Sequence, residues 1–160
     1  MSLVSILQAG RRDFLDAMAG QPNAKPRSGW SVLECVEHVA AVEERHLAWL
    51  TSAEEIMPVR DAEKELRLFS IMRSRLEKVE TPELFVPRGR FADIESALAA
   101  FEAARAAMVE VVRAKGDAIY AIGMTHPYFG EVNGAELAHL ADGHARRHAE
   151  QIREIVEGTA

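Results

Sequence analysis

The chain has little of several features that mark particular protein classes. Its 160 residues include one cysteine, so no disulfide can form within the chain. No stretch approaches the run of roughly 20 apolar residues that spans a membrane. Residues 1–12 lack the basic start and apolar run of a secretory signal. We therefore expect a cytoplasmic protein that does not enter a membrane.

Positive charge and aromatic residues are also scarce. The chain has 19 Lys and Arg against 25 Asp and Glu, a formal net charge of −6, and aromatics make up 6%. An acidic surface repels phosphate backbones, and the sequence has no basic stripe with interleaved aromatics. We therefore expect no nucleic-acid partner.

Alternation of apolar and polar residues, the pattern typical of strands, is rare as well. The length and a hydrophobic content of 48% suit one soluble domain over residues 1–160. Abundant Ala, Leu, Glu and Arg with helical apolar spacing predicts an all-α fold, an antiparallel bundle of four long helices and one shorter one. The expected helices cover about 3–18, 31–56, 61–79, 93–114 and 133–156, with loops over 21–30, 81–90 and 123–132.

Two segments carry a strong signal for the start of a helix. Ser31 is followed by Glu34, and Asn133 is followed by Glu136. Each pair forms a capping box, in which two side chains satisfy free backbone N–H groups. Trp30, just before the first box, is expected to pack on Cys35 as a hydrophobic staple.

Six histidines are the unusual feature of the composition. His144 and His148 are four residues apart, so they lie one turn apart on the apolar side of the last helix. Imidazoles facing a core need a partner, which is a metal ion, a carboxylate or a backbone carbonyl. His38 lies on the apolar face of the second helix, and three inward histidines would form a metal site with open positions. A core histidine with one hydrogen bond is the alternative for each.

The remaining histidines fit this site less well. His139 lies on the charged side of the last helix with Asp142, so we expect it to face solvent. His46 points about 80° away from His38 around the second helix and is not expected to be a ligand. His126 either lines the mouth of the site or is a turn residue before a proline.

Two further side chains lie one turn from a candidate ligand. Cys35 precedes His38, and its thiol is either a ligand or a small buried group in a helix interface. Gln151 follows His148 and either orients an imidazole or a bound water, or makes an interhelical hydrogen bond.

Three blocks of sequence together resemble the DinB-like superfamily. Residues 30–40 read WSVLECVEHVA, like that family's W-S-x-x-E-x-x-x-H-L motif. Residues 125–133 read THPYFGEVN, like the loop before its last helix, and residues 144–152 read HARRHAEQI, like H-x-x-x-H-x-x-Q-I. Residues 87–105 match more loosely. The order and separation of the blocks match over nearly the whole chain.

The resemblance implies an up-down four-helix bundle with a long connection between the second and third helices. It also implies a divalent metal held by three histidines, which map onto His38, His144 and His148. Members with known chemistry are mostly transferases or isomerases that use a low-molecular-weight thiol, and many members have no assigned activity. The family commonly forms homodimers. A small-molecule substrate follows from this chemistry.

A mechanism follows as a hypothesis. Three neutral imidazoles leave the double charge of the ion uncompensated, so a bound water or thiol loses its proton more easily. Gln151 and His126 are the candidate catalytic residues, and Tyr128 is a candidate for holding the cosubstrate at the mouth. Zinc is the first choice of metal, with nickel, iron or manganese as alternatives.

Two other functions stay open. A metal-dependent hydrolase would need a general base, for which Glu34, Glu37 and Glu43 lie on the second helix, although Glu34 is expected to cap it. A requirement for added thiol separates the two enzymes. A non-catalytic helical dimer or binding module would instead have a site sealed from solvent.

Overall fold

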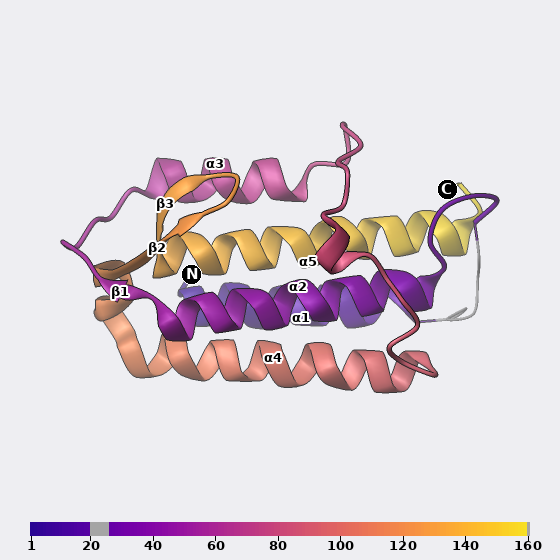
Figure 1. Cartoon of the computed structure of the whole chain (residues 1–160), viewed down its shortest axis with the longest axis horizontal. Coiled ribbons are helices and arrows are strands. Elements are labelled where there is room, and N and C mark those ends of the chain that lie inside the picture. Colours follow the sequence, from indigo (N-terminus) through magenta and orange to yellow (C-terminus); the bar gives the residue numbers. More distant parts are fainter. Residues whose placement is uncertain (20–25, 160) are drawn as a thin grey trace.

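The computed structural model describes residues 1–19 and 26–159, which form mainly helices with a small sheet (Figure 1). Residues 21–25 of the predicted first loop lie outside the described residues. The α-helices are α1 (Leu3–Ala17), α2 (Val32–Ser52), α3 (Ala62–Arg73), α4 (Ile94–Lys115) and α5 (Gly134–Glu157). The short elements are the 3-10 helices η1 (Glu83–Phe85) and η2 (Gly116–Ala121) and the strands β1 (Glu54–Glu55), β2 (Ile122–His126) and β3 (Gly130–Asn133).

All five predicted helices are confirmed, and both capping boxes are present. The side chain of Ser31 accepts from the backbone of Glu34, and that of Asn133 accepts from Glu136, with the reciprocal bonds also made. The ends of two helices differ from the prediction. α2 ends at Ser52 instead of residue 56, and α3 ends at Arg73, six residues before its predicted end at residue 79.

The fold is mainly helical, as predicted, but it also contains a small sheet, and the prediction of a compact loop over 123–132 is wrong. This segment is an antiparallel hairpin in which His126 is paired with Gly130, and β1 adds a third strand by pairing with β2. Gly130 has a φ of +69°, a conformation that glycine adopts without strain in the turn. The backbone that follows α2 therefore pairs with β2 instead of forming further helical turns, which explains why α2 ends early.

The sheet also reveals the directions of the long helices. α2 leads into β1 and α4 leads through η2 into β2, so both helices end at the sheet and run parallel. α5 begins at the sheet, directly after β3, and runs antiparallel to both (Figure 1). The predicted up-down order therefore fails between α2 and α4, because α3 carries the chain back along the molecule before α4 starts.

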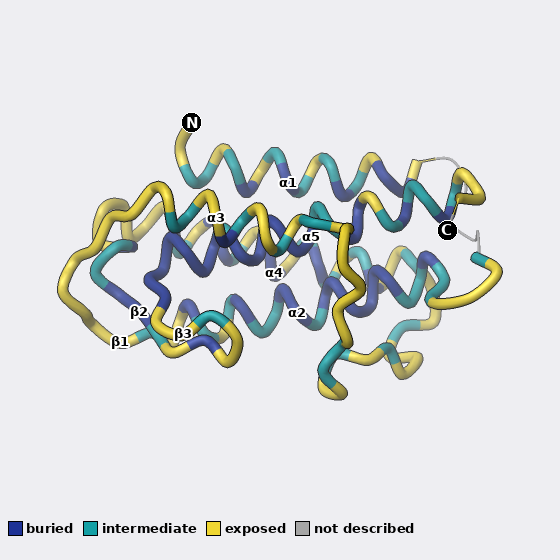
Figure 2. The backbone as a smooth tube through the Cα atoms, turned by 90° about the horizontal axis from the view of Figure 1, so that it is seen from above, coloured by how far each residue is buried: buried dark blue, intermediate teal, exposed yellow. Residues whose placement is uncertain are grey.

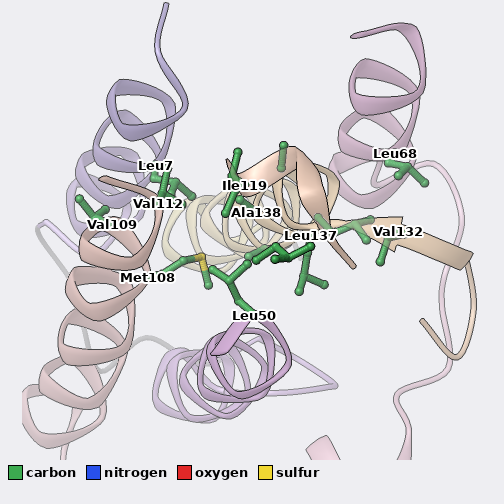
Figure 3. Packing of buried hydrophobic residues seen from close by; sticks show 14 residues of the cluster. Leu7, Leu50, Leu68, Met108, Val109, Val112, Ile119, Val132, Leu137 and Ala138 are labelled. Carbon is green, nitrogen blue, oxygen red and sulfur yellow. The ribbon is translucent and has the colours of Figure 1, made fainter. Parts of the chain in front are cut away.

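The core is divided into two apolar clusters along the helices. One lies near the sheet and includes Leu7, Leu50, Met108 and Leu137 (Figure 3). The other includes Phe14, Val36, Phe101 and Ile152 at the opposite end. α5 is buried along most of its length, whereas α3 covers it from outside and stays largely exposed (Figure 2). No helix in the described ranges is long and apolar enough to cross a membrane.

Candidate metal centre

The contact between α2 and α5 brings three histidines together. His38 from α2 meets His144 and His148 from α5, and one ligand nitrogen of each lies within 4.8 Å of the others. The Nε2 atoms of His38 and His144 are 3.0 Å apart. All three side chains are buried. The structure therefore assembles the set of residues that the sequence predicted as ligands.

Hydrogen bonds at the outer nitrogens orient two of the rings. Nδ1 of His38 lies 2.8 Å from the carbonyl oxygen of Phe85, so this nitrogen carries the proton and donates it. Nδ1 of His148 lies 2.7 Å from Oε1 of Gln151, and we assign it as a donor in the same way. Both rings then present an unprotonated Nε2, which is the form that binds a metal ion.

The third ring has an unsatisfied nitrogen. Nδ1 of His144 is buried and has no hydrogen-bond partner within the described part of the chain. Without a cation, the Nε2 atom of His144 would have to donate to His38, and its bare Nδ1 would stay unpaired. Three imidazoles alone therefore leave one buried ring nitrogen without a hydrogen bond.

Burial keeps the three imidazoles neutral. It lowers the pKa of His38, and it lowers the pKa values of His144 and His148 well below the ordinary value. A charge on one ring disfavours a charge on the next, which adds to this effect at His144 and His148. At neutral pH all three are therefore free of the proton that would compete with a metal ion.

The donor set fits a divalent cation. Nitrogens bound to one tetrahedral zinc ion at about 2.0–2.1 Å lie about 3.3 Å apart, close to the observed 3.0 Å between His38 and His144. Three protein ligands leave a coordination position open, as in catalytic rather than structural sites. Imidazole also binds nickel, iron and manganese, so the three histidines alone do not determine which of these metals or zinc is bound.

Aromatic and backbone groups enclose this centre. The ring of Trp30 lies 4.8 Å from that of His38 and 6.4 Å from that of His148, measured between centroids. The carboxylate of Glu37 accepts hydrogen bonds from the backbone N–H groups of Arg88 and Arg90 at 2.8 and 3.2 Å. Positions 37 and 38 of α2 therefore hold η1 and the chain that follows it against the site.

The structure places two of the other predicted site residues elsewhere. His126, at the end of β2, is buried beside His46 and Trp49, with ring centroids 6.2 and 5.1 Å away. Tyr128, at the hairpin turn, is 71% exposed. Neither belongs to the three-histidine cluster, and their proposed roles at its mouth stay predictions. His46 is likewise outside the cluster, as expected from its direction on α2.

The prediction that His139 faces solvent is wrong. Its Nε2 lies 3.3 Å from a carboxylate oxygen of Glu65 on α3, and its side chain is 15% exposed. Asp142, on the same side of α5, is completely buried. His139 is covered because α3 packs on this side of α5, and Asp142 is covered by Arg105 of α4 and Gly10 of α1. The sequence pattern alone assigned this charged face to water.

Cys35 lies outside the ligand cluster. Its side chain is buried in the second apolar cluster, and burial raises the pKa of its thiol to about 12. Such a thiol stays protonated and is a poor ligand, so the structure favours the interpretation as a buried apolar group. Phe85 was not expected as a partner of His38, because a backbone carbonyl leaves no signal in the residue type.

Comparison with known proteins agrees with this geometry. The family model described as DinB superfamily matches residues 7–152. A search of curated proteins and a search of solved structures each returned no match. The matched region contains His38, His144 and His148 with the residues that orient them, and the chain belongs to the DinB superfamily.

Proposed function

We propose that this protein is a metal-dependent enzyme in which His38, His144 and His148 bind one divalent cation, with zinc as the first choice. The observation that carries the proposal is the convergence of three buried imidazoles, two of them fixed with Nε2 turned inward. We further propose that α1, α2, α4 and α5 form the four-helix bundle expected for the family.

The proposed chemistry is transfer or isomerisation that depends on a low-molecular-weight thiol. A cation held by neutral ligands lowers the pKa of a thiol or water that binds it. The protein's own part is to orient the ligands through Phe85 and Gln151 and to exclude water with Trp30. The substrate is then a small electrophilic molecule.

The acidic residues near the site favour a thiol over a hydrolytic mechanism. Glu34 caps α2, Glu37 accepts two backbone N–H groups, and Glu43 is paired with Arg105. Glu34 and Glu43 are therefore not free to take a proton from water, and Glu37 has only its Oε2 left to do so. We also propose that the protein is cytoplasmic, as its composition suggests, and that it forms the homodimer implied by the family resemblance.

Metal content is the first test. The protein is purified without chelator and its metals are measured by elemental analysis, alongside His144→Ala and the control His139→Ala. We expect about one equivalent in the parent and in the control, and a large loss in His144→Ala. Equal metal in all three proteins would refute the site.

Activity is tested separately. The zinc-loaded protein is mixed with a panel of thiols and an electrophile such as an epoxide or a halogenated compound. Turnover that requires both metal and thiol supports the transferase. Metal-dependent turnover of ester or amide substrates without thiol would support the hydrolase, and no turnover across both panels would favour a binding module.

A further inference from the structure

A fully buried arginine joins the two helices that carry the histidines. The guanidinium group of Arg105, on α4, pairs with both carboxylate oxygens of Glu43 on α2, through Nε and, at 3.2 Å, through Nη2. Its Nη1 donates to Oδ1 of Asp142 on α5 at 3.0 Å and to the carbonyl oxygen of Leu7 on α1 at 2.9 Å. Arg105 thus links its own helix, α4, to the other three long helices.

This charged layer lies between the two apolar clusters. On α2, Glu43 separates the cluster residue Ala40 from Leu50, and on α4, Arg105 separates Phe101 from Met108. On α1 the corresponding position is glycine: a Cβ atom at Gly10 would lie 1.7 Å from Oδ1 of Asp142. The absence of a side chain at Gly10 therefore leaves space for the buried carboxylate of Asp142.

We infer that Arg105 is a positioning residue for the metal centre, which fixes the register of α2 against α5. Glu43 is five residues after His38, and Asp142 is two residues before His144. Apolar contacts are non-directional and can be remade in another register, whereas a shift of one turn, about 5.4 Å, would leave a buried charge unpaired. A buried polar residue sets the register of coiled coils in the same way.

The energetics of buried ion pairs make this inference testable. Replacing a whole buried ion pair or triad by apolar groups of similar volume is often neutral or stabilising, whereas removing one partner is not. A role in register therefore predicts a variant that folds but loses the alignment of its ligands. A role in stability alone predicts that the metal site is unchanged in any variant that folds.

The experiment replaces the three fully buried side chains of the layer together, with Glu43→Met, Arg105→Met and Asp142→Leu. Arg146, which also pairs with Asp142 at 2.9 Å, is partly exposed and is left in place. Folding is checked by circular dichroism, and zinc affinity is measured by competition with a chelator. The absorption spectrum of the cobalt-loaded protein reports ligand geometry. We expect a folded protein with zinc affinity lowered at least about tenfold, the size seen when groups that orient ligands are removed. We also expect an altered cobalt spectrum.

A matched control removes an ion pair that does not join ligand-bearing helices. Arg11 and Glu102 are 2.6 Å apart and link α1 to α4, so the double variant Arg11→Met with Glu102→Met should leave affinity and spectrum unchanged. If the triple variant does not fold, Arg105→Lys replaces it, because an ammonium keeps the charge but not the fork that holds two carboxylates. We expect a smaller loss of affinity in the same direction.

The metal measurements rest on the proposed function, so a readout without metal is included. In crystals of the metal-free triple variant, or of Arg105→Lys in its place, we expect the Nε2 atoms of His38 and His144 to lie well beyond the 3.0 Å of the parent. An unchanged separation would overturn the inference, as would unchanged affinity and spectrum. Failure of the parent to bind metal would instead refute the metal centre, while the crystals still decide the role of Arg105.

Discussion

Nδ1 of His38 donates a hydrogen bond to the carbonyl oxygen of Phe85 at 2.8 Å, across 47 positions of sequence. The bond joins a candidate metal ligand on α2 to the 3-10 helix η1, which lies in the connection between α3 and α4. The connection therefore selects the tautomer of His38. Changes in this segment should reach the metal centre without touching a ligand.

Glu37→Ala tests this coupling. The substitution removes the acceptor for the backbone N–H groups of Arg88 and Arg90, so the segment that carries Phe85 loses its anchor. We expect zinc affinity, measured by chelator competition, to fall about tenfold, as for other groups that orient a ligand.

The control for this prediction is Glu44→Ala. Glu44 binds the side chain of Arg90 at the surface, through contacts of 2.6 and 2.9 Å, and leaves the backbone anchor in place. Exposed ion pairs contribute little, about 0–1 kcal/mol, so the affinity should stay within a few-fold of the parent. Equal losses in the two variants would mean that the anchor at Glu37 does not transmit to His38.

Gln151→Leu tests the second oriented ring. The variant removes the oxygen that accepts from Nδ1 of His148 at 2.7 Å, so the ring is free to turn. We expect zinc affinity to fall about 10- to 100-fold. Gln151→Glu keeps an acceptor at the same place and should retain the affinity; loss in both variants would point to packing rather than to the hydrogen bond.

Local sequence signals account for the parts of the structure that were predicted correctly. Apolar residues at helical spacing predicted the five helices, and the capping pairs predicted two starts. Four-residue spacing placed His144 and His148 on one face of the last helix, and the apolar pattern of the second helix placed His38 on its inward face. Each of these signals lies within a few turns of one helix.

Features that depend on distant pairing were missed. The partner of β1 lies almost 70 residues away along the chain, at Ile122 and Gly123, so two acidic residues after α2 gave no sign of a strand. Asp142, on the charged face of α5, is buried by contacts with α4 and α1, which no local pattern within α5 predicts. Arg105 did have a local signal, because it continues the apolar face formed by Phe101 and Met108. An arginine on such a face indicates a buried partner.

Gly10→Ala tests the space around the charged layer. In an ordinary helix interior this change stabilises by up to about 1 kcal/mol. Here the new Cβ would lie 1.7 Å from Oδ1 and 2.7 Å from Cγ of Asp142, whose side chain is held by Arg105. We expect the free energy of unfolding in urea to fall by about 3 kcal/mol, the upper range for overpacking. Gln8→Ala, at an exposed position of the same helix, is the control and should stay within about 0.5 kcal/mol.

His46 makes the metal-free protein sensitive to acid. It is buried, with Nδ1 2.8 Å from the carbonyl oxygen of Val42 and Nε2 without a partner among the described residues. Burial lowers its pKa from 6.5 to about 4, although the bond to Val42 opposes this, and His126 and Arg105 lower it slightly further. Between these two values the unfolded chain binds the proton and the folded protein does not, so stability is lost as the pH falls from 6.5 to about 4.

His46→Gln removes this dependence. The shift from 6.5 to about 4 corresponds to about 3 kcal/mol, so the free energy of unfolding of the parent should fall by that much more than that of the variant between neutral pH and pH near 4. Urea unfolding with a chelator present measures both proteins without metal, and the titrating carboxylates are common to both. Parallel stability curves over this range would mean that His46 is protonated as readily in the folded protein as in the unfolded chain, and that water reaches its Nε2 atom.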